Sequence, residues 1–248
     1  MERGAAYFPA PERGSVQAPD RRKAGRARES EAVDVGAGVT GLLVGLAVGP
    51  VADRIATNAP ARVPLLAAAP VSRRLGLVTA ATGALAGASG LDFGFTAEAA
   101  IAAFLCFVLV VITRTDFEHR LIPNRVVLPA ALAVLAARTL DDPSVEWVAA
   151  ALGAGLVLFL TVLAYPRGMG MGDVKLSLLL GAALGVSVLV GLFLGFIAAF
   201  VPAVALLVRH GSAARKRAIP LGPFLALGGV VALFAGDAIL DWYGGLGG

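Results

Sequence analysis

Two aspartates beside apolar segments are the residues of this chain that could do chemistry together. Asp116 opens the stretch Asp-Phe-Glu-His-Arg-Leu-Ile-Pro-Asn, and Asp173 closes the stretch Gly-Met-Gly-Asp. An ionisable group placed in or at a membrane is costly, so it is a candidate functional residue. Two carboxylates that meet can activate a water molecule and protonate a carbonyl, which is general acid–base chemistry. The pair therefore predicts an intramembrane-type aspartyl peptidase.

The composition predicts the fold class in which these aspartates must be positioned. The 248 residues are 58% hydrophobic and 15% charged, with a mean hydropathy of +0.81, whereas soluble domains average about 25% charged residues. The apolar runs are long and lack the alternation of transmembrane barrel strands. We therefore expect an all-α, polytopic transmembrane helical bundle. The basic residues are interpreted as reporting membrane topology, and no nucleic-acid partner is expected. The single cysteine, Cys106, is interpreted as a small buried hydrophobic residue.

The chain divides into a polar tail and a series of apolar segments. Residues 1–33 mix charges with Pro and Gly and show no apolar periodicity, which predicts a disordered tail. Residues 34–73 are predicted to hold a first span and a short cytoplasmic loop without cysteine, and residues 74–243 the peptidase membrane domain. The predicted spans are 35–57, 74–91, 97–114, 125–140, 146–165, 174–190, 191–208 and 221–240.

The count of eight spans depends on one break and on the loop charges. The stretch 176–208 carries no charge and would be about 50 Å long as one helix, too long for a single span. A turn at Gly185 and Ser187 divides it. Eight spans then place every strongly basic loop, and both aspartates, on the cytoplasmic side. Two features disagree with the rule that basic residues face the cytoplasm. The basic tail 1–33 lies outside in this arrangement, and Arg138 lies near an outer helix end, where it is expected to snorkel.

Each aspartate taken alone has an ordinary interpretation. Pro123 interrupts any helix that continues from the preceding span, so Asp116 is expected on a short connector at the interface, where a solvated acid would be unremarkable in function. Asp173 follows a Gly-rich stretch and is expected at a helix N-terminus, where capping aspartates are common. Glycines there also allow the chain to bend and a substrate backbone to approach closely. The two motifs together favour catalysis.

Three segments in order resemble the type IV prepilin peptidase family of aspartyl proteases: Asp116 to Asn124, Gly170 to Leu176, and Ile219 to Gly228. The resemblance covers roughly residues 74–240. It implies that Asp116 and Asp173 are the catalytic pair. The residues implied to shape the site or bind substrate are Gly170, Gly172, Lys175, Pro123 and Asn124. It further implies a multi-pass protein of the bacterial cytoplasmic membrane whose active site faces the cytoplasm. Its partners would be the lipid bilayer and the helix of a prepilin or pseudopilin, whose leader peptide it hydrolyses.

Several expectations accompany this interpretation. No cofactor is implied, and no metal, because no His, Cys and Glu cluster has ligand spacing. The loop 58–73 lacks the cysteine pairs of longer family members, and Gly49 stands where Asn is usual in the family, so N-methylation is not expected. Lys175 at a helix end is equally explained as a membrane anchor. Asp237 is expected to face the bundle or the interface.

Two other functions remain open from the sequence. One is a small ion-coupled transporter, which would need polar groups deep in several spans. The other is a non-catalytic membrane protein of pilus or secretion assembly. Which prepilin is the substrate, and whether the protein forms a homo-oligomer, are also open.

Overall fold

Eight α-helices and one short 3₁₀-helix make up the part of the chain that the structure describes. The structure is a computed structural model and describes residues 21–68, 72–166, 169–210 and 219–245. The elements are α1 (Arg21–Ala61), α2 (Leu75–Phe93), α3 (Ala97–His119), α4 (Asn124–Asp141), α5 (Val145–Ala164), α6 (Met171–Leu184), η1 (Gly185–Ser187), α7 (Val188–His210) and α8 (Gly222–Gly245). No strand occurs within these ranges. The predicted all-α class is confirmed.

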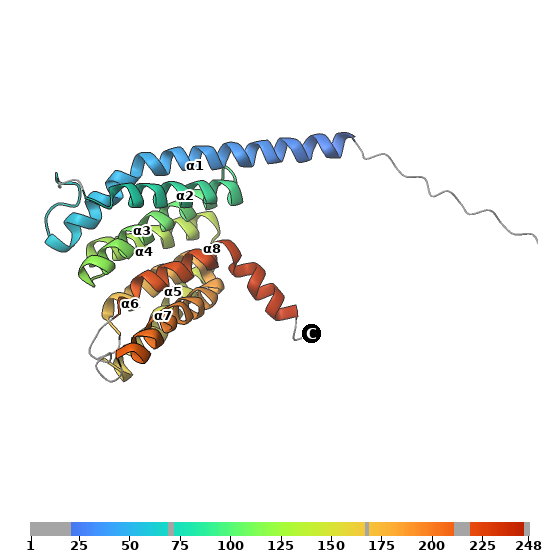
Figure 1. Ribbon diagram of the computed structural model, residues 1–248. Coiled ribbons are helices and arrows are strands. Elements are labelled where there is room, and N and C mark those ends of the chain that lie inside the picture. The colour runs from blue at the N-terminus through green and yellow to red at the C-terminus, as the bar shows by residue number, and fades with distance from the viewer. Residues whose placement is uncertain (1–20, 69–71, 167–168, 211–218, 246–248) are drawn as a thin grey trace, which may run out of the picture.

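Five helical segments are long and apolar enough to cross a membrane. They are Ala32–Ala61, Ala97–His119, Val145–Ala164, Met171–Arg209 and Gly222–Gly245. The predicted apolar segments each correspond to a helix, but α2 and α4 do not meet this criterion on their own. They lie alongside their neighbours in the bundle, α2 between α1 and α3 and α4 beside α3 (Figure 1). The count of eight spans therefore stays a prediction.

The predicted break in the charge-free stretch is confirmed. α6 ends at Leu184, η1 covers Gly185–Ser187, and α7 starts at Val188. Gly185 has φ +57°, a left-handed conformation that costs glycine little and other residues more. The backbone thus changes direction where a single helix would have been too long for one span.

α1 extends toward the N-terminus into the segment predicted as tail. It begins at Arg21, so residues 21–33 are helical, which is consistent with their content of Ala, Arg, Lys and Glu, all good helix formers. Residues 1–20 of the predicted tail lie outside the described residues. The C-terminal part of α1 packs closely on α2. A Cβ on Gly45 would lie 2.6 Å from the Thr82 carbonyl oxygen, so small residues allow the two backbones to approach.

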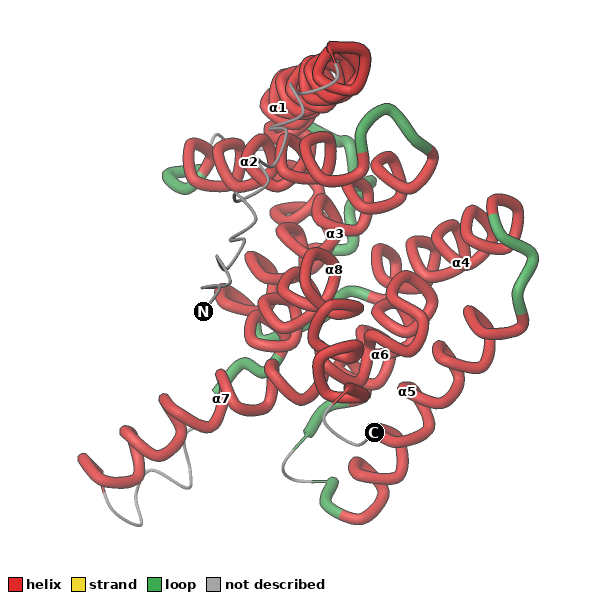
Figure 2. Tube along the Cα trace, turned by 90° about the vertical axis from the view of Figure 1, so that its right-hand side faces the viewer, coloured by secondary structure: helices red, strands yellow, loops and turns green. Residues whose placement is uncertain are grey.

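The core lies around α3, α6 and α8, which occupy the middle of the molecule between the α1–α2 pair and α5 (Figure 2). α3 contacts α1, α2, α4, α6 and α8. The largest fully buried side chains include Leu105, Leu109, Ile112, Leu176, Leu179, Leu180 and Leu225. Any residue on the inner faces of these three helices is therefore held by several neighbours at once.

Two predictions about the end of the bundle away from the aspartates have different outcomes. Arg138 does not snorkel: it is buried, lies 3.2 Å from the Glu98 carboxylate, and donates to the Ala183 carbonyl at 3.1 Å. Its guanidinium also stacks over Trp147 at 4.7 Å from the ring centroid. An inward arginine is stable here because these partners replace its water. Asp237, expected to face the bundle or the interface, is exposed and accepts a hydrogen bond from the hydroxyl of Ser187 in η1.

Candidate active site

Asp116 lies in the last turn of α3, not on a connector. It is 6% exposed, and α3 continues to His119. Arg120 then ends the helix in the left-handed conformation, φ 50°, and its N–H donates to the Asp116 carbonyl at 2.9 Å. The prediction placed the helix end too early, because Pro123 prevents helix only in the residues just before it and serves as the N-cap of α4. Asp116 is thus a buried helical side chain, and the solvated interpretation is wrong.

The carboxylate of Asp116 points to the start of another helix. Its Oδ2 accepts a hydrogen bond from the Gly222 N–H, at 3.0 Å, and Gly222 is the first residue of α8. The N-terminus of a helix carries partial positive charge, which favours an anionic group there. Asp116 and the side chain of Arg120 line one cavity, which is described below.

Asp173 lies at the N-terminus of α6, as predicted. It is the third residue of that helix and is 8% exposed. Its Oδ2 accepts from the N–H of Gly170 at 3.1 Å, and Gly170 is the N-cap residue, with φ −94° and ψ 155°. This is the N3-to-N-cap half of a capping box. Both carboxylates therefore accept a hydrogen bond from a backbone N–H at the start of a helix.

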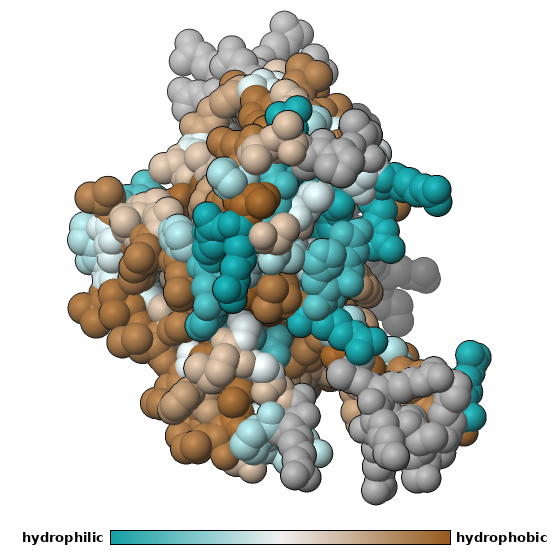
Figure 3. All heavy atoms as spheres, turned by 90° about the vertical axis from the view of Figure 1, so that its left-hand side faces the viewer, coloured by the Kyte–Doolittle hydropathy of each residue, from teal (hydrophilic) through white to brown (hydrophobic). Residues whose placement is uncertain are grey.

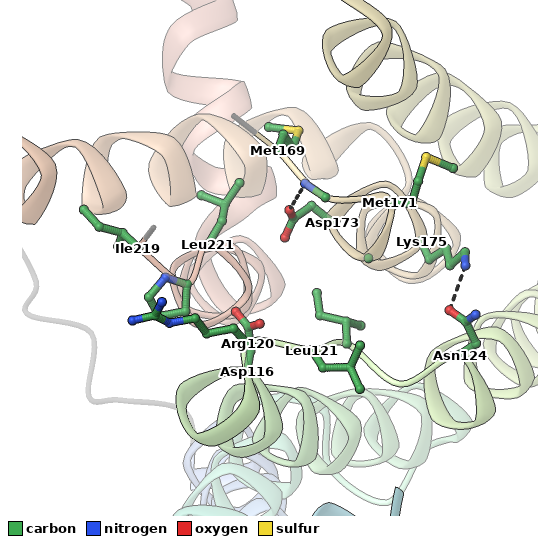
Figure 4. A pocket seen from close by; sticks show the side chains of 14 residues that line it. Asp116, Arg120, Leu121, Asn124, Met169, Met171, Asp173, Lys175, Ile219 and Leu221 are labelled. Carbon is green, nitrogen blue, oxygen red and sulfur yellow. Dashed lines mark hydrogen bonds between the residues drawn. The ribbon is translucent and has the colours of Figure 1, made fainter. Parts of the chain in front are cut away.

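The two aspartates meet at one cavity. Its volume is about 570 Å³, and both side chains line it. Figure 4 shows the Asp116 carboxylate directed into this cavity from α3 and that of Asp173 from the start of α6. The other lining residues are Arg120, Leu121, Ile122, Asn124, Met169, Gly170, Met171, Gly172, Lys175, Ile219, Pro220 and Leu221. Its lining comes from the α3–α4 connection, the start of α6 and the residues just before α8. Figure 3 shows this end of the molecule, with hydrophilic residues across its middle and hydrophobic residues on the left.

The other predicted site residues surround the pair in different ways. Gly172 lies against Ile122, and a Cβ there would be 3.0 Å from the Ile122 Cβ. Lys175 donates to the Asn124 side-chain oxygen at 2.7 Å, a contact that lies to one side of the aspartates in Figure 4. Pro123 is buried at the start of α4. The structure thus places Lys175 as a link between α6 and α4.

One buried ion pair near the site was not predicted from the sequence. Arg114, at the end of the predicted span 97–114, is buried and lies 2.5 Å from the Asp53 carboxylate of α1. The Arg114 guanidinium donates a hydrogen bond to the Asp53 backbone carbonyl at 2.6 Å. Its contact with Asp53 Oδ1 is an ion pair without hydrogen-bond geometry. Glu118 lies 3.6 Å from the Arg114 Nε. In the sequence, the pair could have been inferred from the opposite charges of Asp53 and Arg114, which lie at the ends of two apolar segments that the topology places on the same side of the membrane.

The described residues contain no group of three or more His, Cys, Asp or Glu side chains that could hold a metal ion. What the site offers is two carboxylates facing a common space large enough for water and a peptide segment. That arrangement can deliver a proton and remove one at the same bond.

A helical bundle with membrane-length apolar helices and two buried aspartates at one cavity is typical of membrane-embedded aspartyl peptidases as a class. The chain belongs to the type IV leader peptidase family, whose model matches residues 103–208. That range contains both aspartates.

Named relatives agree with this assignment. The prepilin leader peptidase/N-methyltransferase of Bacillus subtilis is 36% identical over 167 residues, which cover 65% of this chain and 66% of the relative. The protein of the same name from Pseudomonas aeruginosa is 34% identical over 191 residues, 71% of this chain and 63% of the relative. The one from Legionella pneumophila is 32% identical over 190 residues, 70% and 63%. The matches thus span somewhat less than two thirds of these relatives. No solved structure matched the chain.

Proposed function

We propose that this protein is a membrane aspartyl endopeptidase that hydrolyses the leader peptide of type IV prepilins or pseudopilins. The observation that carries the proposal is the meeting of Asp116 and Asp173 at one cavity, each buried and each on a different helix. The relatives named as prepilin leader peptidases support the substrate class. The basic loops support a site at the cytoplasmic face of the inner membrane, within a bundle of eight spans.

The chemistry follows from sharing one proton between two carboxylates. Neighbouring carboxylates titrate as a coupled pair, so a state with one proton exists over a range of pH. The ionised member takes a proton from water, and the water oxygen forms a bond to the scissile carbonyl carbon. The protonated member gives its proton to the carbonyl oxygen. When the tetrahedral intermediate collapses, the C–N bond breaks: the carboxyl that took the water proton gives it to the amide nitrogen, which leaves with the mature chain, and a hydroxyl proton of the intermediate returns to the other carboxylate.

The remaining site residues receive supporting roles in this proposal. Gly170 and Gly172 keep the start of α6 free of side chains, so that a substrate backbone can come close to Asp173. Pro123 starts α4, and Asn124 holds Lys175 across the cavity wall. In the same proposal, residues 34–73 support the peptidase domain of residues 74–243.

The apolar core makes the alternative of an ion-coupled transporter unfavourable, because it offers no path for an ion. Polar groups lie at the Asp116 end of α3 and near Arg138 at the other end, but the inner face of α3 between them presents Leu105, Leu109 and Ile112, each at most 1% exposed. An ion path would need polar groups or water along that distance. Both aspartates are present and face one cavity, which is also more than a non-catalytic assembly protein needs.

Purified protein in lipid or detergent, mixed with a prepilin, tests the proposal by the mass of the product. We expect Asp116→Asn and Asp173→Asn each to abolish cleavage while the proteins remain folded, because Asn has a similar shape but cannot exchange the proton. Asp237→Asn, at the opposite end of the bundle, is the matched control and should cleave normally. Full processing by either of the first two variants would reject the catalytic pair.

A further inference from the structure

The N-terminus of α8 contacts Asp116 through a single residue. The N–H of Gly222 donates to Asp116 Oδ2 at 3.0 Å. The first N–H groups of a helix have no acceptor within that helix. Those of Phe224 and Leu225 turn back to the Leu221 carbonyl, each at 3.0 Å, whereas that of Gly222 reaches across to α3. The Asp116 carboxylate thus satisfies a donor that α8 itself cannot satisfy.

The absence of a side chain at this position is what permits the contact. A Cβ on Gly222 would lie 2.8 Å from Asp116 Oδ2 and 3.2 Å from Asp116 Cγ. Real Cβ atoms do not approach other heavy atoms within 3.0 Å, so any other residue here must displace either the carboxylate or the start of α8.

Ile122 connects this contact to the second aspartate. A Cβ on Gly222 would lie 3.3 Å from Ile122 Cδ1, and a Cβ on Gly172 would lie 3.0 Å from Ile122 Cβ. The Ile122 side chain is buried, 6% exposed, and so packs between the starts of α6 and α8. The start of α6 carries Asp173, and the start of α8 binds the Asp116 carboxylate through the Gly222 N–H. The separation of the two carboxylates therefore depends on the packing of Ile122 against Gly172 and Gly222.

We propose that Gly222 is a positioning residue for the peptidase reaction: its N–H orients Asp116, and its lack of a side chain leaves the carboxylate free to face Asp173. The proposal rests on the proposed function. It assigns a role outside the region matched by the family model, residues 103–208.

The first test compares two glycine substitutions in the same helix. Gly222→Ala should lower kcat for prepilin cleavage by roughly 10²-fold with little change in KM, because displacing a catalytic group by about 1 Å costs that much. Gly236→Ala is the matched control: its Cβ would also lie 2.8 Å from a neighbour, the Cβ of Ser187, but beside η1 and away from the aspartates. It should lose similar thermal stability and keep wild-type kcat. Equal kcat values for the two variants would overturn the proposal.

The second test does not depend on activity. In ¹⁵N-glycine-labelled protein, the amide resonance of Gly222, identified by its loss in Gly222→Ala, should shift in Asp116→Asn and stay in place in Asp237→Asn. An unchanged resonance in Asp116→Asn would overturn the proposal. If the wild-type protein cleaved no prepilin while the resonance still shifted in Asp116→Asn, the peptidase function would be rejected and the contact between α8 and Asp116 confirmed.

Discussion

The buried ion pair between α1 and α3 gives the sharpest prediction about stability. The Arg114 and Asp53 side chains are 6% and 5% exposed, and Arg114 also bonds the Asp53 carbonyl. In Asp53→Asn the shape is kept but the negative charge is lost. A guanidinium cannot release its proton in a protein, so Arg114 would stay charged without a full counter-charge, and Glu118 at 3.6 Å is partly exposed to solvent.

Breaking a buried pair from one side costs about 3–5 kcal/mol. For a chain of this size, 1 kcal/mol shifts Tm by about 2–4 °C. We therefore expect Asp53→Asn to lower the Tm of the purified protein in detergent by roughly 6–20 °C. Below that temperature, prepilin cleavage should keep its kcat, because Arg114 points to α1 and does not line the cavity of the aspartates.

Two variants make the measurement decisive. Asp92→Asn, an exposed aspartate near the end of α2, is the control and should change the free energy of unfolding by less than about 0.5 kcal/mol. The double variant Asp53→Leu with Arg114→Met replaces the pair by apolar groups and should recover most of the lost stability. If Asp53→Asn melted within about 2 °C of Asp92→Asn, the pair would not hold α1 to α3 as argued.

Four further outcomes can be measured on the same preparations. Lys175→Met should lower turnover by less than about fivefold, because its ammonium bonds an amide oxygen of α4 and one such bond is worth about 1 kcal/mol; a 100-fold loss would place it in the chemistry. Arg138→Met should lower Tm, since it removes the contacts to Glu98 and the Ala183 carbonyl, yet leave turnover at low temperature unchanged. EDTA should not inhibit cleavage, because the carboxylates themselves move the protons; inhibition reversed by zinc would contradict this. Incubation with labelled S-adenosylmethionine should leave the mature terminus unmethylated, since loop 58–73 has no cysteine pairs; a gain of one methyl group would refute the expectation.

Local pattern was enough to predict the helices and the pair of aspartates. Apolar runs near the length of a membrane span, separated by charges, predicted a helix for each of α1 to α8, because the hydrophobic content of a segment is a property of that segment alone. The break at Gly185 was predicted because the charge-free stretch 176–208 is too long for one span. The position of Asp173 at a helix start was predicted from the glycines before it. The helix end after Asp116 was predicted less well, since the effect of Pro123 reaches only its nearest neighbours.

The contacts that join these helices to one another were decided by the tertiary structure. The hydrogen bond from Gly222 to Asp116 joins α8 to α3, the Arg114 pair joins α3 to α1, and Arg138 is buried rather than snorkelling because Glu98, Ala183 and Trp147 meet it from other helices. Each depends on how helices distant in sequence are rotated and spaced against one another. Periodicity along one helix carries no information about that rotation, so only packing determines which donor meets which carboxylate.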